Sequence, residues 1–364
     1  MSVVKAISLF SGGLDSICAT RLVMKQGVEV IAVKFVTPFF GYEVLRDQES
    51  YRREIRKKYG IDVMVVDISD DYLQMLRNPA HGFGKFFNPC IDCKIFMLER
   101  AKKMMSELGA SFLITGEVLG QRPMSQRRDT LNVIERDSGS RTMLLRPLSA
   151  KLMKETEAEL SGLVDRERLL DFSGRGRSRQ IALAKSYGIE DYPSPAGGCI
   201  LADPILSKRI SRIYAGEFVV GQDEMNVTDI LLMLVGRQYL LPGGGWLILG
   251  RDEKENLRLD ELAEAGDLRV DIEERPGPTA LLRRADHLYA DDQQRLRDIN
   301  RAAALVVRYA KKLDGEFAPG NVLIGAGDSQ YEIHAEPAVD EELRKRMGDA
   351  AVSLTQEAGY VNAG

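Results

Sequence analysis

The sequence lacks the features of a membrane protein and those of a disulfide-stabilised one. No apolar run approaches the roughly 20 residues that a bilayer span needs, and the start shows no cleavage site of a secretory signal. Four cysteines among 364 residues are too few for a disulfide scaffold and indicate reduced thiols with a specific use. A net charge of -4 argues against unspecific coating of nucleic acid, although a local basic surface can still hold RNA. We therefore expect a cytoplasmic protein of two or three domains, without a membrane partner.

The most informative segment is a glycine-rich loop, Ser11-Gly12-Gly13-Leu14-Asp15-Ser16. It stands between a strand-like apolar run, residues 3–10, and a helix-like periodic stretch, residues 17–24. Its glycines let backbone N–H groups close on a polyphosphate, the hydroxyls of Ser11 and Ser16 add donors, and the helix start supplies partial positive charge. The loop is neither a Walker A loop nor a dinucleotide-binding GxGxxG motif. It predicts that the chain binds ATP.

Strand-like and helix-like segments alternate over the first half of the chain. Strands are expected at residues 3–10, 28–36, 63–68, 112–115 and 142–145, and helices at 14–25, 47–59, 94–108 and 151–163. This alternation predicts an α/β fold, a doubly wound parallel sheet with helices on both faces. Ligands in such sheets lie at the carboxyl ends of the strands, so the loops after residues 10, 36 and 115 should meet at one nucleotide.

Three of the four cysteines form a pattern of their own. Cys90 and Cys93 are a C-x-x-C pair where a loop opens into a helix, and Cys199 follows two glycines. The helix start favours thiolates, and the glycines let the backbone approach a shared centre. Cys18 falls within the first expected helix, and we interpret it as core packing.

The residues alone leave open what these three cysteines hold. A closed zinc site needs a fourth ligand, and His81 is the only histidine near the pair in sequence. An iron-sulfur cluster on three thiolates would keep one iron open for a non-protein ligand such as sulfide. A thiol relay, with a persulfide on one cysteine and a second cysteine that resolves it, is a further interpretation. Three unrelated buried thiols remain the simplest one.

Two motifs resemble a known superfamily. Residues 11–16 are similar to the signature of the PP-loop ATP pyrophosphatases, and residues 116–126, which read GEVLGQRPMSQ, resemble the second nucleotide motif of the tRNA 4-thiouridine synthases. With the cysteines, residues 1–205 look like the tRNA-thiolating branch, including 2-thiouridine synthases and iron-sulfur-dependent relatives. The resemblance implies ATP-dependent replacement of a nucleobase oxygen by sulfur, with tRNA as substrate, sulfide or a persulfide as sulfur donor, and ATP, Mg²⁺ and a [4Fe-4S] cluster as cofactors.

The resemblance also implies roles for particular residues. The ATP contacts would be Ser11, Gly12, Gly13, Leu14, Asp15, Ser16, Val33, Lys34, Phe35, Gly116 and Gln121. The catalytic residues would be Asp15, Cys90, Cys93, Lys94 and Cys199, with the three cysteines holding the metal. Asp15 could instead cap its helix, and Lys94 could be an ordinary solvated residue rather than one that steadies developing negative charge.

The chain shows no further C-x-x-C pairs that could form zinc fingers, and we expect no separate N-terminal domain that captures tRNA. Two other segments are therefore candidates for binding the substrate. Basic residues outnumber acidic ones between residues 122 and 154, and a second basic run spans residues 175–179. Arginine side chains can form two hydrogen bonds to one phosphate. Runs of basic residues are, however, often only a solvent-exposed charged surface. The predicted RNA contacts are Arg122, Gln126, Arg127, Arg128, Arg175, Arg177 and Arg179.

The second half of the chain has a different pattern. We place a domain boundary after residue 204, so residues 1–204 form the PP-loop domain and residues 205–364 an α+β domain. Strands are expected at residues 246–250, 268–272, 279–282, 321–324 and 331–334, and helices at 293–312 and 339–347. Residues 249–252, Asn256, 267–269 and 276–278 are similar to the RNA-binding module of the NFACT family. A lid or a dimerisation domain, with the chain as a homodimer, is the alternative.

Two other functions compete with the sulfurtransferase. One is an ATP-gated RNA-binding protein with a structural metal site. The other is a PP-loop ligase or amidase, which needs adenylation but no three-thiolate centre. The three cysteines favour the sulfurtransferase over both.

Overall fold

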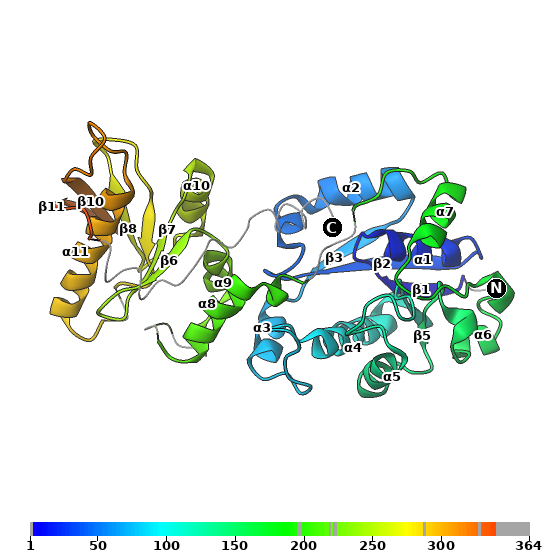
Figure 1. Ribbon diagram of the computed structural model, residues 1–364. Helices are drawn as coiled ribbons and strands as arrows, with labels where there is room; N and C mark the ends of the chain where they lie inside the picture. The colour runs from blue at the N-terminus through cyan, green and yellow to red at the C-terminus, as the bar shows by residue number, and fades with distance from the viewer. Residues whose placement is uncertain are drawn as a thin grey trace. The chain divides into compact units, whose positions relative to one another are not determined.

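The computed structural model describes residues 3–194, 199–217, 220, 224–286, 289–326 and 329–339. The described chain divides into two compact units, one up to Ala202 and one from Asp203. Figure 1 shows the elements of each unit.

A parallel five-stranded sheet forms the centre of the N-terminal unit. Its strands are β1 (Lys5–Leu9), β2 (Glu29–Val36), β3 (Val63–Asp67), β4 (Phe112–Thr115) and β5 (Leu144–Leu145), in the order β3-β2-β1-β4-β5. The middle strand β1 pairs with β2 and β4, with Ile7 opposite both Ile31 and Leu113. The strand order reverses direction at β1, so the loop after β1 lies where such sheets bind ligands.

Helices cover both faces of this sheet. α1 (Leu14–Met24), α2 (Gln48–Tyr59) and α7 (Ser178–Ser186) lie on one face, and α3 (Ser69–Arg77), α4 (Cys90–Leu108) and α5 (Arg128–Asp137) on the other (Figure 1). Ile17, Ile55 and Ala184, one from each helix of the first group, share one hydrophobic core with the sheet. The predicted α/β class, a doubly wound parallel sheet, is confirmed.

One predicted helix is wrong. Residues 151–163 form a 3-10 turn, η2 (Ala150–Leu152), and a separate short helix, α6 (Glu157–Leu160). Thr156 and Glu159 form a capping box, in which the Thr156 N–H donates to the Glu159 carboxylate at 2.8 Å, so a new helix starts there. The sequence analysis also missed α3, α5 and α7, and α4 begins at Cys90 instead of residue 94.

The C-terminal unit has an antiparallel six-stranded sheet. Its strands are β6 (Arg237–Leu240), β7 (Trp246–Leu249), β8 (Leu268–Ile272), β9 (Ala280–Leu282), β10 (Gly320–Ala326) and β11 (Ser329–Ala335), in the order β11-β10-β8-β9-β7-β6. Its helices are α8 (Pro204–Tyr214), α9 (Val227–Met233), α10 (Glu253–Leu262) and α11 (Asp292–Tyr309). The buried face of α11, with Ala302 and Val306, packs into the core of this sheet. β6 and α8 to α10 had not been predicted, and the helix predicted for residues 339–347 lies almost wholly outside the described residues.

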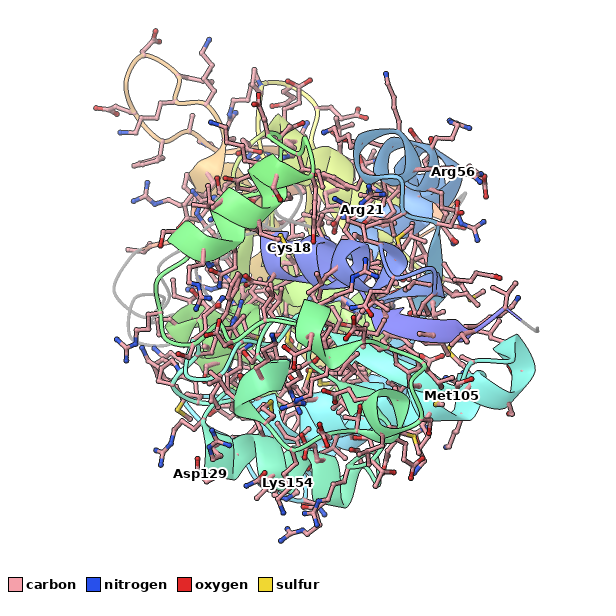
Figure 2. The ribbon with its side chains drawn as sticks, turned by 90° about the vertical axis from the view of Figure 1, so that its right-hand side faces the viewer. Cys18, Arg21, Arg56, Met105, Asp129 and Lys154 are labelled. Carbon is pink, nitrogen blue, oxygen red and sulfur yellow. The ribbon has the colours of Figure 1, made fainter. Side chains whose placement is uncertain are left out.

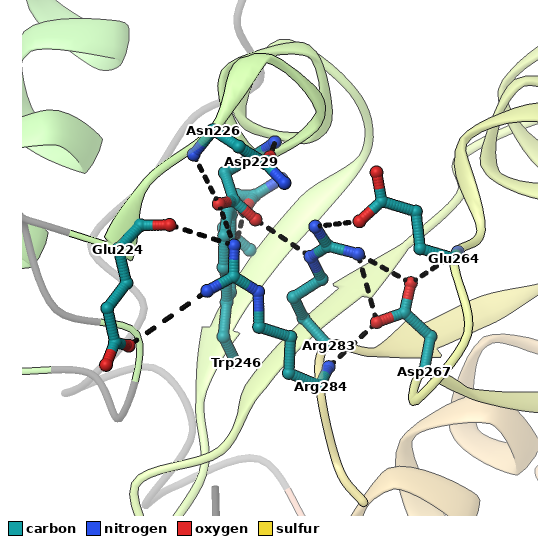
Figure 3. A network of polar contacts seen from close by, with 9 residues as sticks. Glu224, Asn226, Asp229, Trp246, Glu264, Asp267, Arg283 and Arg284 are labelled. Atoms are coloured by element: carbon teal, nitrogen blue, oxygen red, sulfur yellow. Dashed lines mark hydrogen bonds and ion pairs between the residues drawn. The ribbon is translucent and has the colours of Figure 1, made fainter. Parts of the chain in front are cut away.

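A buried ionic network holds β9 to its surroundings (Figure 3). The Arg283 guanidinium is fully buried and binds Asp229 at 2.8 Å, Asp267 at 2.9 Å and Glu264 at 2.7 Å. The neighbouring Arg284 has a φ of 52° and also bonds to Asp229. A buried guanidinium is tolerated only when it is fully paired, so this network fixes the position of α9 on the sheet.

Within the described residues, no helix is both long and apolar enough to cross a membrane.

Candidate active site

The phosphate loop turns from β1 into α1. Gly12 has a φ of 87°, which a side chain would disfavour, and Gly13 is the N-cap residue in an extended conformation. Ser16 Oγ donates to the Gly13 carbonyl at 2.8 Å, and Ser11 Oγ donates to Ser16 Oγ at 3.2 Å. No side chain caps the start of α1, so its first N–H groups can bind an anion. The loop is built as a phosphate cradle.

Gly116 lets β4 pass directly over the start of α1. A Cβ on Gly116 would lie 2.6 Å from the Asp15 carbonyl carbon and 2.6 Å from the Ser16 nitrogen. Both are backbone atoms and cannot yield as a flexible side chain could. The two nucleotide motifs are therefore in direct contact, as the alternation of strands and helices predicted for loops at the carboxyl ends of the strands.

Side chains of the second motif also hold Asp15. Gln121 Nε2 donates to Asp15 Oδ2 at 2.6 Å, and Gln180 Nε2 donates to Gln121 Oε1 at 3.0 Å. The Arg177 guanidinium approaches the same Asp15 oxygen at 3.7 Å. Asp15 Oδ1 is buried and has no partner, which suits a carboxylate oxygen that coordinates a cation. The sequence analysis missed the site residue Gln180. It lies outside both motifs, and only the fold brings it to Gln121.

Three predicted nucleotide residues lie on β2, beside the loop. Val33 and Phe35 are buried in the unit, and Val33 accepts a hydrogen bond from the Phe10 N–H at 2.8 Å. Lys34 Nζ, also buried, donates to the Ser11 carbonyl at 3.1 Å. Burial lowers the pKa of Lys34 to about 8, against the opposing effect of Glu43. Lys34 therefore brings a titrating charge to the back of the phosphate loop.

A buried ionic network follows Gly116 in the second motif. Glu117 pairs with Lys94 at 2.8 Å and with Arg146 at 2.9 Å, and Arg146 also contacts Glu135. Burial alone would raise the pKa of Glu117, but the charges of Lys94 and Arg146 outweigh it and lower that pKa to about 2. Lys94 is thus paired rather than merely solvated. Because Lys94 follows Cys93 and Glu117 follows Gly116, direct contacts join the cysteine segment to the phosphate loop.

The fold brings the three predicted cysteines together. Cys90 and Cys93 lie in the first turn of α4, Cys199 comes from a distant segment, and all three are partly buried. Burial raises the pKa of the Cys93 thiol to about 11 and that of Cys199 to about 12. Cys93 adds to the rise at Cys199, and Cys90 adds to the rise at both. Tyr72, which the sequence analysis missed, hydrogen-bonds to the Cys93 thiol from α3. We call Cys90, Cys93 and Cys199 the cysteine cluster.

His81 is not a fourth ligand of this cluster. Its Nδ1 lies 3.0 Å from Asp92 Oδ1, and its Nε2 lies 2.9 Å from Asp137 Oδ2. The Asp92 hydrogen bond, followed by that from Asp137, raises the pKa of His81. Among the residues that the structure describes, no three His, Cys, Asp or Glu side chains stand in a geometry that could hold a metal ion. The cysteine cluster offers soft donors in one place, without a closed metal-binding geometry.

The fourth cysteine is part of the core. Figure 2 shows Cys18 on α1, inside the N-terminal unit, where its side chain is fully buried. Its thiol donates to the Gln180 carbonyl at 3.6 Å, and burial raises its pKa to about 12. The prediction that Cys18 is a packing residue is confirmed.

The predicted RNA contacts fall into different environments. Gln126 is buried and accepts the Arg122 N–H, so it shapes its own loop, while Arg122 itself is exposed. Arg127 pairs with Asp129, which Figure 2 shows at the outer edge of the unit. Arg128 bonds the Leu152 carbonyl.

The second basic run is divided in the same way. Arg177 points to Asp15 in the phosphate loop, whereas Arg179 pairs with Asp171 and stacks on Phe172. Arg175 is exposed. Of the basic residues in the stretch 122–154, Arg146 is buried and pairs with Glu117 and Glu135, so it is not a surface residue.

A separate cavity of about 400 Å³ lies in the C-terminal unit. Its lining residues are Arg237, Gly250, Arg251, Asp252, Glu253, Asn256, Pro276, Gly277, Pro278 and Tyr309. The structure thus gathers most of the segments similar to the NFACT module around one cavity, with residues 267–269 outside the lining. Asn256 links two of them, because its Oδ1 accepts the Thr279 N–H at 3.1 Å and its Nδ2 donates to the Gly277 carbonyl at 3.4 Å. Arg237 stacks on Tyr309 at 4.5 Å, and neither had been predicted.

The parallel sheet, the SGGLDS loop at its switch point and the GEVLGQ segment against that loop resemble the features of PP-loop ATP pyrophosphatase domains. Residues 2–159 match the family model described as thiamine biosynthesis protein (ThiI). The N-terminal unit is therefore similar to this family over residues 2–159, in agreement with its motifs.

Relatives of known name match the same part of the chain. A probable tRNA sulfurtransferase of Thermococcus kodakarensis is 29% identical over 135 residues, which are 37% of this chain and 34% of that protein. The tRNA sulfurtransferase of Desulfurococcus amylolyticus is 27% identical over 208 residues, 57% of this chain and 37% of that protein. The chain spans about a third of the length of these relatives. A solved 4-thiouridine synthetase–RNA complex with bound ATP overlaps 51% of this chain and 41% of its own, at 24% identity and a TM-score of 0.35.

Proposed function

We propose that the protein is an ATP-dependent tRNA sulfurtransferase, which adenylates a nucleobase carbonyl and replaces its oxygen with sulfur. One observation carries the proposal: the phosphate loop and the cysteine cluster belong to one unit and are joined by the Lys94–Glu117 ion pair and the Gly116 contact. The names of the relatives agree with this reaction.

The first half-reaction would take place at the phosphate loop. The uridine carbonyl oxygen attacks the α-phosphorus of ATP, the bond to the β-phosphate breaks, and pyrophosphate leaves. The N–H groups at the start of α1, with the hydroxyls of Ser11 and Ser16, would hold the phosphates as charge shifts to pyrophosphate. Asp15 Oδ1 is the free carboxylate oxygen that Mg²⁺ would need, and Gln121 keeps that carboxylate oriented.

The second half-reaction would use the cysteine cluster. A sulfur nucleophile attacks the adenylated carbon and AMP departs with the original oxygen, so the carbonyl becomes a thiocarbonyl. Cys90, Cys93 and Cys199 would hold a [4Fe-4S] cluster, which when bound supplies an iron with an open position for sulfide. Soft thiols suit this group, and burial keeps those of Cys93 and Cys199 protonated until a metal displaces the protons.

Cysteine variants test the proposal. We expect Cys90→Ala, Cys93→Ala and Cys199→Ala each to abolish thiolated nucleoside, measured by mass spectrometry of digested tRNA, while ATP binding by calorimetry stays within about twofold. Cys18→Ala is the matched control, a buried thiol of the same unit that should keep sulfur transfer. An ATP-gated binding protein with structural zinc would unfold in all three variants, and a ligase or amidase would keep its activity in them.

The occupant of the cluster is tested separately. Protein that is purified without oxygen should absorb at about 400 nm, where iron-sulfur clusters have charge-transfer bands. It should also contain iron and acid-labile sulfide. Colourless, active protein with a trapped Cys persulfide would replace the cluster with a thiol relay. Zinc instead of iron in the purified protein would favour the alternative, an RNA-binding protein with a structural metal site.

For the C-terminal unit we propose a part in RNA capture. Its cavity is large enough for one nucleotide, and the stacked Arg237 and Tyr309 offer both charge and an aromatic face. Tyr309→Ala should weaken tRNA binding without changing ATP binding. Unchanged tRNA affinity together with loss of a dimer in sedimentation would assign the unit to dimerisation instead.

A further inference from the structure

An exposed aromatic loop lies between α3 and α4 in the N-terminal unit. We call residues 83–87 the aromatic loop. Phe83 is 39% exposed and Phe86 43% exposed, although large apolar side chains are usually covered. The centres of the Phe83 and Phe87 rings lie 4.8 Å apart, and the two rings are inclined to each other by 54°. The loop therefore presents aromatic faces to solvent in an ordered arrangement.

Phe86 is held outward at a conformational cost. Its φ of 56° lies in the left-handed region, which a bulky residue rarely adopts. Such strain persists where the surroundings impose it, and it concentrates at sites that act on ligands. Two hydrogen bonds close the turn, from the Gly84 N–H to the Asn88 carbonyl at 2.9 Å and from the Asn88 N–H to the Lys85 carbonyl at 3.4 Å.

The aromatic loop stands beside both reactive segments. It leads within three residues into Cys90, and a Cβ on Gly84 would lie 3.1 Å from the Met124 side chain of the second nucleotide motif. Met124 is 55% exposed and extends the apolar surface. Arg122, two residues before Met124, acts electrostatically on Cys199. The exposed rings thus lie on the loop that leads into Cys90 and that contacts the second nucleotide motif.

Unmatched positive charge accompanies the rings. Lys85 Nζ lies 5.3 Å from the centre of the Phe86 ring, and Arg122 is exposed on the neighbouring loop. Neither cation has a carboxylate partner within the described ranges. Aromatic faces with free cations suit unpaired nucleotides, whose bases stack on the rings while their phosphates meet the charges. Duplex RNA exposes phosphates but not base faces, so it would use the cations alone.

We propose that the aromatic loop, with Met124, Lys85 and Arg122, is a stacking platform for unpaired bases of the RNA next to the nucleobase that receives sulfur. The proposal rests on the proposed function. A base inside a duplex cannot present its carbonyl to both ATP and the sulfur nucleophile. The target base must therefore unstack from its neighbours. Stacked neighbours would hold the strand open beside the segment that leads into Cys90.

Substitutions at Phe86 separate stacking from simple apolar contact. The probe is a fluorescein-labelled single-stranded oligouridine, with a base-paired RNA of equal length as reference, both measured by anisotropy at one fixed salt concentration. Phe86→Ala should weaken single-strand binding about tenfold and duplex binding less than about twofold. Phe86→Trp should restore the affinity and Phe86→Leu should not. Leu160→Ala, at a 70% exposed position on α6, is the matched control.

Phe86→Gly should change stability and RNA binding in opposite directions. Glycine tolerates the left-handed φ, so this variant should melt at a higher temperature than the native chain and still bind single strands about tenfold more weakly. A stable Phe86→Ala protein with native single-strand affinity would overturn the platform. So would full rescue by Phe86→Leu, or a native chain that binds duplex and single strand alike.

The same proteins distinguish this proposal from the proposed function. If Phe86 controls single-strand binding and anaerobic enzyme yields no thiolated nucleoside, the platform stands and the sulfurtransferase fails. If thiolated nucleoside forms while Phe86→Ala binds normally, the sulfurtransferase stands and the platform fails.

Discussion

The phosphate loop and the cysteine cluster lie in one unit, yet they are built in opposite ways. The phosphate loop uses backbone N–H groups and glycines that are contiguous in sequence, and Gly116, Lys34 and Gln121 support it from outside. The cysteine cluster uses side chains from two distant segments, and Tyr72 and His81 support it from outside the motif. A site made of backbone tolerates almost no added volume, whereas a site made of side chains depends on the network that positions them.

The largest expected effect comes from filling the space at Gly116. Gly116→Ala would place a methyl group 2.6 Å from backbone atoms of Asp15 and Ser16 and displace the start of α1. ATP affinity measured by calorimetry should fall at least about 100-fold, because small displacements of a binding constellation are costly. Gly176→Ala is the control, since a Cβ there meets open space and the backbone is unstrained. Equal ATP affinity in the two variants would show that the phosphate loop is more compliant than its geometry implies.

The next effect tests the link between the sites. Glu117→Gln removes the carboxylate that pairs with Lys94 and Arg146, so Lys94 loses this partner and the buried Arg146 keeps only its pair with Glu135. The free energy of unfolding should fall by about 3 kcal/mol, and sulfur transfer should fall more than ATP binding does. Asp129→Asn breaks an exposed pair with Arg127 and should leave the denaturation midpoint unchanged. Identical midpoints for Glu117→Gln and the native chain would contradict the network.

A smaller effect should appear in the pH dependence of ATP binding. Burial lowers the pKa of Lys34 to about 8, so its charge beside the phosphate loop is complete at pH 7 and is lost as the pH rises through 8. ATP affinity should therefore fall about tenfold between about pH 7 and pH 9. In Lys34→Met, calorimetry should find weaker ATP binding with little dependence on pH. A native profile that stays flat would remove Lys34 from nucleotide binding.

The smallest effect concerns the cysteine side. The pKa of His81 is raised above its usual value by the Asp92 and Asp137 carboxylates, with Arg136 also paired to Asp137. His81 therefore stabilises its loop fully below about pH 6.5, and this contribution disappears as the pH rises through the raised pKa. Hydrogen exchange of the amides in residues 78–88, corrected for intrinsic rates, should quicken above that pH. If the exchange rates of the His81→Gln variant rose in the same way, the pH dependence would belong to another group.

The sequence was most informative where structure is local. The glycine loop and the strands that precede and follow it could be predicted, because backbone conformation at glycines and apolar periodicity depend on neighbouring residues. The helix predicted for residues 151–163 was wrong because a capping box at Thr156 outweighs helix propensity over that stretch. Arg146 and Gln126 gave the same signal as exposed polar residues, although both are buried.

The sequence by itself therefore determined the phosphate loop, the parallel sheet around it and the identity of three candidate thiols. Only the tertiary structure decided that Cys199 joins Cys90 and Cys93, that Gln180 and Gln121 hold Asp15, and that Phe86 stands exposed. The reason is physical. Short-range conformational preferences are written in neighbouring residues, whereas burial, charge pairing and contacts between distant segments depend on how the whole chain packs.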